Sequence, residues 1–141
     1  MAVTLLLSSA GRRVALLECF RESARAANID LKVLACDMEP DLSAACRLAD
    51  KAFAVPGCGD PAFVERMLEI SRRHDVDLIV PTIDPELSVY SKNIARFAEC
   101  GTRVHVSPPS VIDVVRDKLL TAETLDAAGV PVPVTHTLAY G

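Results

Sequence analysis

The chain is 141 residues long, half of its residues are apolar and its net charge is −4. This length suits one compact α/β domain, and the negative charge, with no basic cluster longer than two adjacent arginines, argues against a surface that binds duplex nucleic acid. The sequence has no apolar stretch of bilayer length and no signal-peptide pattern, and its five cysteines lack metal-ligand spacing. We therefore expect a cytoplasmic protein with reduced thiols, no membrane segment and no metal site.

Strand-like and helix-like segments alternate five times along the chain. Each short apolar run predicts a buried strand, and each segment with apolar residues three or four positions apart predicts a helix. The strands are expected at 3–7, 31–36, 52–55, 77–80 and 103–106, and the helices at 12–27, 42–48, from 60 onward, 84–101 and 107–116. Units of this kind form parallel strands joined by right-handed crossovers. The predicted fold class is therefore α/β, an open, doubly wound, Rossmann-like sheet of five parallel strands.

The alternation ends after residue 116. Asp117 and Lys118 open a further helix that closes at Gly129, and a Val-Pro-Val-Pro turn leads into an apolar run at 134–138. No strand is left in the chain to pair with that run. We expect residues 117–141 to be a short helix-plus-strand extension, mobile or paired with a second copy of the chain as a homodimer.

The loop after the first strand is the main candidate for ligand binding. In doubly wound sheets, ligands bind beyond the carboxyl ends of the strands where the strand order reverses, usually between the first and fourth strands. The loop contains Gly11 and leads into a helix N-terminus, whose amides attract anions. Arg12 and Arg13 in the first helical turn oppose the helix dipole, which makes sense if an anion lies between them. The alternative is that both side chains point into solvent.

Acidic residues follow two other strands. Asp37 either holds a ribose diol or caps its own turn, and we favour the turn because only one glycine stands where the dinucleotide fingerprint has three. The same lack argues against a nicotinamide-dinucleotide oxidoreductase. Asp84 and Glu86 fit as a helix cap and a first-turn anion, yet they are also expected opposite the two arginines. The four charges either grip a zwitterion such as an amino acid or form a salt-bridge cluster, and both interpretations stay open.

Four stretches together resemble the N-terminal part of an ATP-grasp ligase of the carbamoyl-phosphate-synthase-like group. They are the loop at 9–13, the turn at 37–40 with 49–51 after it, the segment 81–87, and the helix and turn at 117–133. The resemblance covers nearly the whole chain and implies a preATP-grasp domain at 1–116, followed at 117–141 by the truncated start of an ATP-grasp domain. It implies an acceptor-substrate site for a small anion or amino acid, formed by Gly11, Arg12, Arg13, Asp84 and Glu86. It also implies that Lys118 reaches the phosphates of ATP.

For the complete ligase, the resemblance implies ATP- and Mg²⁺-dependent activation of a carboxylate to an acylphosphate, which a nucleophile then attacks. The second lysine, the adenine pocket and the metal ligands would follow Gly141. We therefore assign no catalytic residue to this chain and expect it to bind neither cofactor tightly and to show no ligase or ATPase turnover alone. The alternative is a standalone small-ligand-binding or regulatory module. A receiver domain is disfavoured because Ser8 and Ser9 stand where its acidic phosphorylation site would be.

Overall fold

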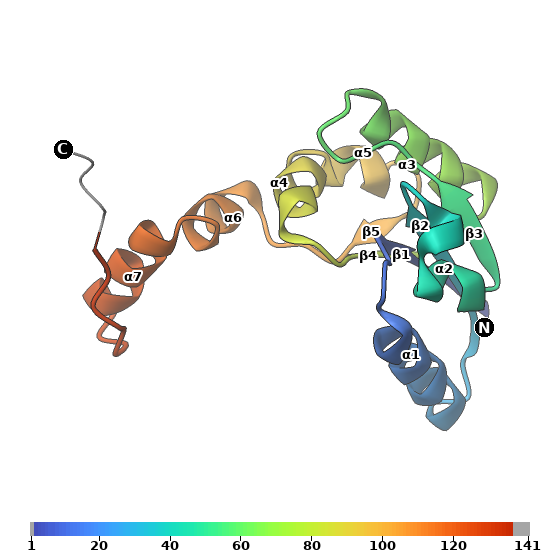
Figure 1. Ribbon diagram of the computed structural model, residues 1–141, viewed down its shortest axis with the longest axis horizontal. Helices are drawn as coiled ribbons and strands as arrows, with labels where there is room; N and C mark the ends of the chain where they lie inside the picture. Colours follow the sequence, from blue (N-terminus) through green and yellow to red (C-terminus); the bar gives the residue numbers. More distant parts are fainter. Residues whose placement is uncertain (1, 137–141) are drawn as a thin grey trace.

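The computed structural model describes residues 2–136, and its centre is a five-stranded parallel sheet (Figure 1). The strands are β1 (Ala2–Ser8), β2 (Asp30–Asp37), β3 (Lys51–Ala54), β4 (Leu78–Pro81) and β5 (Arg103–Val104). Their order across the sheet is β3-β2-β1-β4-β5, and every neighbouring pair is parallel. The predicted fold class is confirmed. The order reverses between β1 and β4, the two strands at which we expected the reversal.

Helices cover both faces of the sheet, as the near-continuous apolar strands require. They are α1 (Val14–Ala26), the short 3-10 helix η1 (Pro40–Leu42), α2 (Ala44–Leu48), α3 (Ala62–Arg73), α4 (Asp84–Lys92), α5 (Ile94–Ala98), α6 (Pro109–Val115) and α7 (Lys118–Ala127). Helices α1 and α3 lie on opposite sides of the sheet in Figure 1.

Alternate residues of the strands enter two separate hydrophobic cores. On one face, Leu6 and Leu34 pack with apolar side chains from α3, α4 and α5. On the other face, Leu5 and Leu7 pack with residues of α1 and α2. Successive side chains of a strand point to opposite faces, so one apolar run supplies both cores.

Three local expectations about helices are wrong. Arg12 and Arg13 precede α1 instead of forming its first turn, with Arg13 at the N-cap. Leu16, expected on the buried face of that helix, is 37% exposed. The single helix expected at 84–101 is interrupted at Asn93, whose side-chain amide donates to the Val89 carbonyl at 2.8 Å. An asparagine side chain that bonds to nearby backbone in this way competes with continued helix formation.

Helices α6 and α7 extend away from the sheet in Figure 1. Helix α7 buries none of its residues. Asp117 caps it as predicted, because its carboxylate accepts from the amides of Leu119 and Leu120 at 2.9 and 3.0 Å. The strand expected at 134–138 lies partly outside the described residues, and its described part, 134–136, is not in a strand.

We expect Asp117→Ala to destabilise α7 by about 0.5–2 kcal/mol, the usual cost of losing an N-cap acceptor. The effect should stay local, because α7 contributes no buried side chain to either core. NMR chemical shifts of residues 118–127 would measure the loss of helicity. Asp126→Ala is the matched control: it removes a carboxylate from the other end of the helix, where negative charge is unfavourable. Unchanged helical shifts in Asp117→Ala would contradict the prediction.

Among the described residues, no helix combines the length and the apolar character needed to cross a membrane.

Candidate functional site

The loop from Ser8 to Arg13 lies at the carboxyl end of β1, beside β4, where the strand order reverses. Two of its residues have left-handed backbone, Ser9 with φ of 48° and Gly11 with φ of 49°. Glycine adopts this conformation freely, whereas for serine it is uncommon and carries a cost. Contacts with neighbouring residues must stabilise this uncommon backbone conformation of Ser9.

Strand β2 and helix α2 hold the loop through its backbone. The Ala10 amide donates to the Cys36 carbonyl at 3.0 Å. The Gly11 carbonyl accepts from the Ala45 amide at 3.0 Å and from the Ser43 hydroxyl at 2.9 Å. These bonds join the loop to β2 and to the start of α2, and they restrain its backbone.

The carboxylate of Asp37 binds a backbone amide of the loop. Its Oδ2 atom accepts from the Gly11 amide at 2.8 Å, and its Oδ1 atom lies 3.5 Å from the Glu39 amide. An internal carboxylate therefore takes the place of an external anion at this one donor. Within its own turn, the role that we favoured over ribose binding, Asp37 makes only the long contact with Glu39. Its main partner is the loop after β1, 26 residues earlier, which no local pattern indicates.

Glu86 is the least expected residue of the site. It lies in the first turn of α4 and is fully buried. Its Oε1 atom accepts from the Ser8 hydroxyl at 2.7 Å and from the Ser9 hydroxyl at 2.6 Å. Since Ser8 has one hydrogen and gives it to Glu86, the Tyr90 hydroxyl donates to Ser8 at 2.8 Å. The Oε2 atom of Glu86 is buried and has no hydrogen-bond partner among the described residues. Burial raises the pKa of Glu86 despite the two hydroxyl donors, which lower it.

The raised pKa predicts a pH dependence of definite sign. The folded protein keeps the Glu86 proton at pH values where the unfolded chain has lost it, so this residue makes stability fall as the pH rises from the usual glutamate pKa through the raised one. Glu86→Gln should therefore gain stability relative to the wild type with rising pH. Urea unfolding of both chains between pH 4 and 8 would measure the difference. Glu69, whose pKa is lowered by a hydrogen bond from Arg66, has the opposite effect on stability. Because both chains contain Glu69, its effect cancels in the difference between them. A constant difference across the range would contradict the assignment.

The two arginines of the loop have different surroundings. Arg13 crosses from the loop to the segment after β4, where its Nη2 atom donates to the Thr82 carbonyl at 3.1 Å. The Thr82 hydroxyl in turn donates to the Ser9 carbonyl at 2.6 Å. Arg12 is exposed, and no hydrogen bond or ion pair to its side chain occurs within residues 2–136. Arg12 is thus the loop cation that is free to meet a ligand.

The expected opposition of two carboxylates and two arginines does not form. Glu86 points into the protein, and Asp84 pairs instead with Arg116, whose Nε atom lies 3.2 Å from the Asp84 carboxylate. No ion pair joins either carboxylate to Arg12 or Arg13 in the described part of the chain. Asp84 is also the first residue of α4 and not its cap. The carboxyl group of Asp84 thereby connects α4 to the residue that follows α6.

Lys118 lies apart from the loop, at the exposed start of α7. It borders a hollow of about 230 Å³ between α7 and the turn at Val132 and Pro133. The structure places Glu86 against the loop through Ser8 and Ser9 and pairs Asp84 with Arg116, while Lys118 lies on α7, away from the loop.

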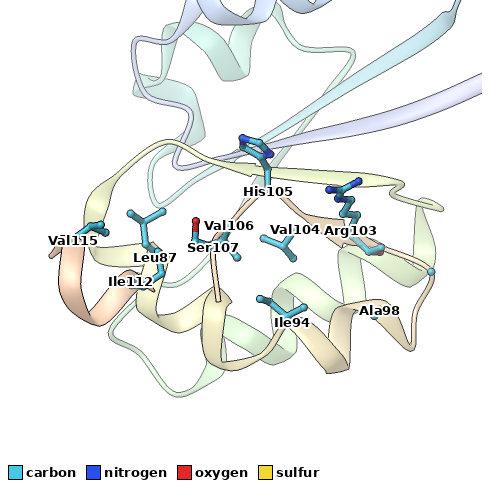
Figure 2. Close-up of a pocket in the computed structure, with 12 residues that line it drawn as sticks. Leu87, Ile94, Ala98, Arg103, Val104, His105, Val106, Ser107, Ile112 and Val115 are labelled. Atoms are coloured by element: carbon cyan, nitrogen blue, oxygen red, sulfur yellow. The ribbon is translucent and has the colours of Figure 1, made fainter. Parts of the chain in front are cut away.

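A larger hollow of about 790 Å³ lies along the edge strand β5 (Figure 2). Apolar side chains of α4, α5 and α6 form its walls, including Leu87, Ile94 and Ile112. Arg103 of β5 and His105, which follows the strand, also border it. None of its lining residues belongs to the Ser8–Arg13 loop. The sequence does not reveal this hollow, because its apolar residues have the same helical spacing as core residues.

The described residues contain no group of three or more His, Cys, Asp or Glu side chains placed to hold a metal ion.

The model of the PylC-like N-terminal domain family matches residues 5–105. Among solved structures, a single-chain, multi-domain long-chain acyl-CoA carboxylase is 22% identical, with a TM-score of 0.60, over 100% of this chain and 14% of its own. The biotin carboxylase domain of a single-chain bacterial carboxylase is 20% identical, with a TM-score of 0.63, over 92% of this chain and 30% of its own. A pyruvate carboxylase from Rhizobium etli is 18% identical, with a TM-score of 0.65, over 99% of this chain and 14% of its own.

No curated protein matches the chain. The chain spans less than a third of the length of each of these three structures, whose similarity concerns the fold alone. Together with the family match, they confirm the resemblance to a preATP-grasp domain.

Proposed function

Because the chain belongs to the PylC-like N-terminal domain family, we propose that it is the acceptor-substrate-binding domain of an ATP-dependent, carboxylate-activating ligase. In this proposal residues 1–116 are the binding domain, and residues 117–141 begin the ATP-grasp domain. The carboxylase structures of similar fold are several times longer than this chain, so the ligase reaction itself belongs to the proposed whole protein.

The observation that carries the proposal is a fixed loop with a free cation. Strand β2 and helices α2 and α4 restrain Ser8 to Gly11 through hydrogen bonds, while the Arg12 guanidinium is exposed without a partner in the described residues. A guanidinium presents several donors in a planar fork that matches a carboxylate or phosphate. The restrained loop supports recognition of a small anion, because its backbone loses little conformational freedom when a ligand binds.

Asp84 extends this proposal to an amino acid. Its side chain is 67% exposed, and within residues 2–136 it forms one ion pair, the exposed contact with Arg116. Exposed pairs of this kind contribute about 0–1 kcal/mol, so Asp84 can exchange Arg116 for a ligand ammonium at little cost. We propose that Arg12, with Arg13 beside it, binds the ligand carboxylate and that Asp84 binds the ammonium. Glu86, being buried, makes no ligand contact in this scheme.

Most of the protein groups that would bind ATP and Mg²⁺ in the proposed ligase lie outside the described residues. Lys118 is exposed and carries a flexible cation suited to a phosphate. One lysine without an acidic cluster does not amount to an ATP–magnesium site, so the donor set here fits the cofactors only in part. ATP would supply the phosphoryl group that activates a carboxylate, and this chain would orient the acceptor. We therefore predict no phosphate release above background when the 141-residue chain is incubated with ATP and Mg²⁺.

NMR titration of the 141-residue chain would test the proposal, with the twenty standard amino acids, inorganic phosphate and bicarbonate as probes. We expect at least one probe to shift the amide signals of Ser8–Arg13 and of Thr82–Asp84. Arg12→Ala should weaken that probe's affinity about tenfold or more, since a charge-assisted hydrogen bond contributes about 1.5–3 kcal/mol. Arg25→Ala, which removes another exposed arginine at the far end of α1, is the matched control and should leave the affinity unchanged.

Two results would overturn the site assignment. One is binding whose affinity neither Arg12→Ala nor Arg13→Ala alters. The other is binding that shifts the residues around the β5 hollow and leaves the Ser8–Arg13 loop unaffected.

A further inference from the structure

Glu86 has features that neither helix structure nor ligand contact explains. A first-turn glutamate ordinarily extends into solvent, where it interacts with the helix dipole at little cost. Here the side chain is fully buried, and its Oε2 atom has no hydrogen-bond partner within residues 2–136. A buried polar atom without a hydrogen bond has lost its contacts with water and destabilises the folded state. Such a cost in a native protein indicates that the residue does something that a cheaper side chain would not.

We infer that Glu86 is a positioning residue, which holds the Ser8–Arg13 loop in the conformation that presents Arg12. The part of this inference that concerns a ligand rests on the proposed function. The part that concerns the loop stands on the contacts alone.

Hydrogen bonds to one oxygen atom supply the restraint. Glu86 Oε1 accepts from the hydroxyls of two consecutive residues, Ser8 and Ser9. Consecutive residues of an extended strand point to opposite faces and could not both reach one acceptor. The left-handed φ of 48° at Ser9 turns the chain so that they can. The carboxylate thus stabilises the very conformation that a serine would otherwise avoid.

A second carboxylate holds the opposite side of the loop. Asp37 accepts from the Gly11 amide, two residues beyond Ser9. The loop is therefore held from two sides. Glu86 of α4 binds its serine side chains, and Asp37 of β2 binds its backbone. Arg12 follows directly after the restrained segment, so the direction in which it leaves the protein depends on both contacts.

The groups that face Glu86 show which kind of contact its carboxyl group can make. They are Ser8 and Ser9 from the loop, Cys36 and Asp37 from β2, the Thr82 backbone and Tyr90 from its own helix. None of these groups is a cation. Burial raises the pKa of the Cys36 thiol to about 12 and raises the pKa of Tyr90, so both are neutral at physiological pH. The surroundings favour an acceptor for two hydroxyls over a buried ion pair.

Two variants distinguish the role of Glu86 as a hydrogen-bond acceptor from the role of its negative charge. Glu86→Gln keeps a carbonyl oxygen for the serine hydroxyls, whereas Glu86→Leu removes the acceptor at similar volume. Glu22→Gln on the exposed side of α1 is the matched control. The readouts are the backbone coupling constant that reports φ at Ser9, and amide hydrogen exchange at Ala10 and Gly11, whose bonds to Cys36 and Asp37 depend on the loop conformation.

We expect Glu86→Gln and Glu22→Gln to keep the wild-type coupling at Ser9. Glu86→Leu should lose it and should exchange the Ala10 and Gly11 amides at least tenfold faster, while amides in the α1 core around Leu17 stay protected. Ser9→Ala, which removes one donor and leaves Glu86 in place, should loosen the same two amides and serves if Glu86→Leu fails to fold. Wild-type coupling and exchange in Glu86→Leu, or in Ser9→Ala if the leucine variant does not fold, would overturn the inference.

Titration of the same variants with the amino acid and phosphate probes distinguishes this inference from the proposed function. If the wild type binds a probe, Glu86→Leu should weaken binding about tenfold and Glu86→Gln should not. If the wild type binds none of the probes while Glu86→Leu still alters the loop, the proposed function fails and the positioning role stands. If Glu86→Leu binds a probe as the wild type does, with its loop unchanged, the positioning role fails and the proposed function stands.

Discussion

Replacing Tyr90 by alanine is expected to lower the free energy of unfolding by about 3–5 kcal/mol, the range found for large aromatic residues in protein cores. Tyr90 is fully buried, and its ring contacts those of Phe63 and Phe97 at centroid distances of 5.6 and 5.5 Å. Because these rings come from α3, α4 and α5, the cavity would weaken the packing of one whole layer. Urea-induced unfolding followed by circular dichroism would measure the loss.

Tyr90→Phe is the control that separates packing from hydrogen bonding. It keeps the ring and removes only the hydroxyl that donates to Ser8, so the expected cost is about 0.5–1.5 kcal/mol. If Tyr90→Ala cost no more than Tyr90→Phe, the aromatic cluster would not be the main support of this face of the sheet.

A loss of about 2–5 kcal/mol is expected for Leu17→Ala, the usual range for a buried leucine. Leu17 is 0% exposed and packs against Leu5 and Leu7 in the second core. Ala24 is the other buried residue of α1, so Leu17 is the principal large side chain that attaches this helix to the sheet. Thermal or urea unfolding would measure the change.

The neighbouring residue provides a matched control. Leu16 is 37% exposed, so Leu16→Ala creates no closed cavity and should cost less than about 1 kcal/mol. Equal losses at the two positions would mean that both leucines are buried, as the helical spacing alone had suggested, and that the orientation of α1 described above is wrong.

Most of the fold was predictable, because its signals are local. An apolar run such as Leu5–Leu7 identifies a strand covered on both faces, and the alternation with helices determines a parallel sheet. The cap at Asp117 was equally readable, since an N-cap bonds to amides only two and three residues away. The helix break at Asn93 was missed, because the apolar spacing continues through it and only the side-chain bond to Val89 reveals it.

The site was predictable in position and not in geometry. The loop at Gly11 to Arg13 was identified from its place after the first strand, and its role in binding stays a prediction. The roles of Asp37 and Glu86 depend on partners 26 and 77 or 78 positions away in the chain, distances at which no periodicity or cap can be read.

By itself, the sequence determined the strands and most of the helices, the fold class and the point between the first and fourth strands where the strand order reverses. These follow from side-chain polarity and from hydrogen bonds within a few residues. Only the tertiary structure decided which charges face the solvent: Arg12 does, Asp84 pairs with Arg116, and Glu86 is buried under the loop. The physical reason is that the environment of a charge is set by the elements packed around it, and these come from distant parts of the chain.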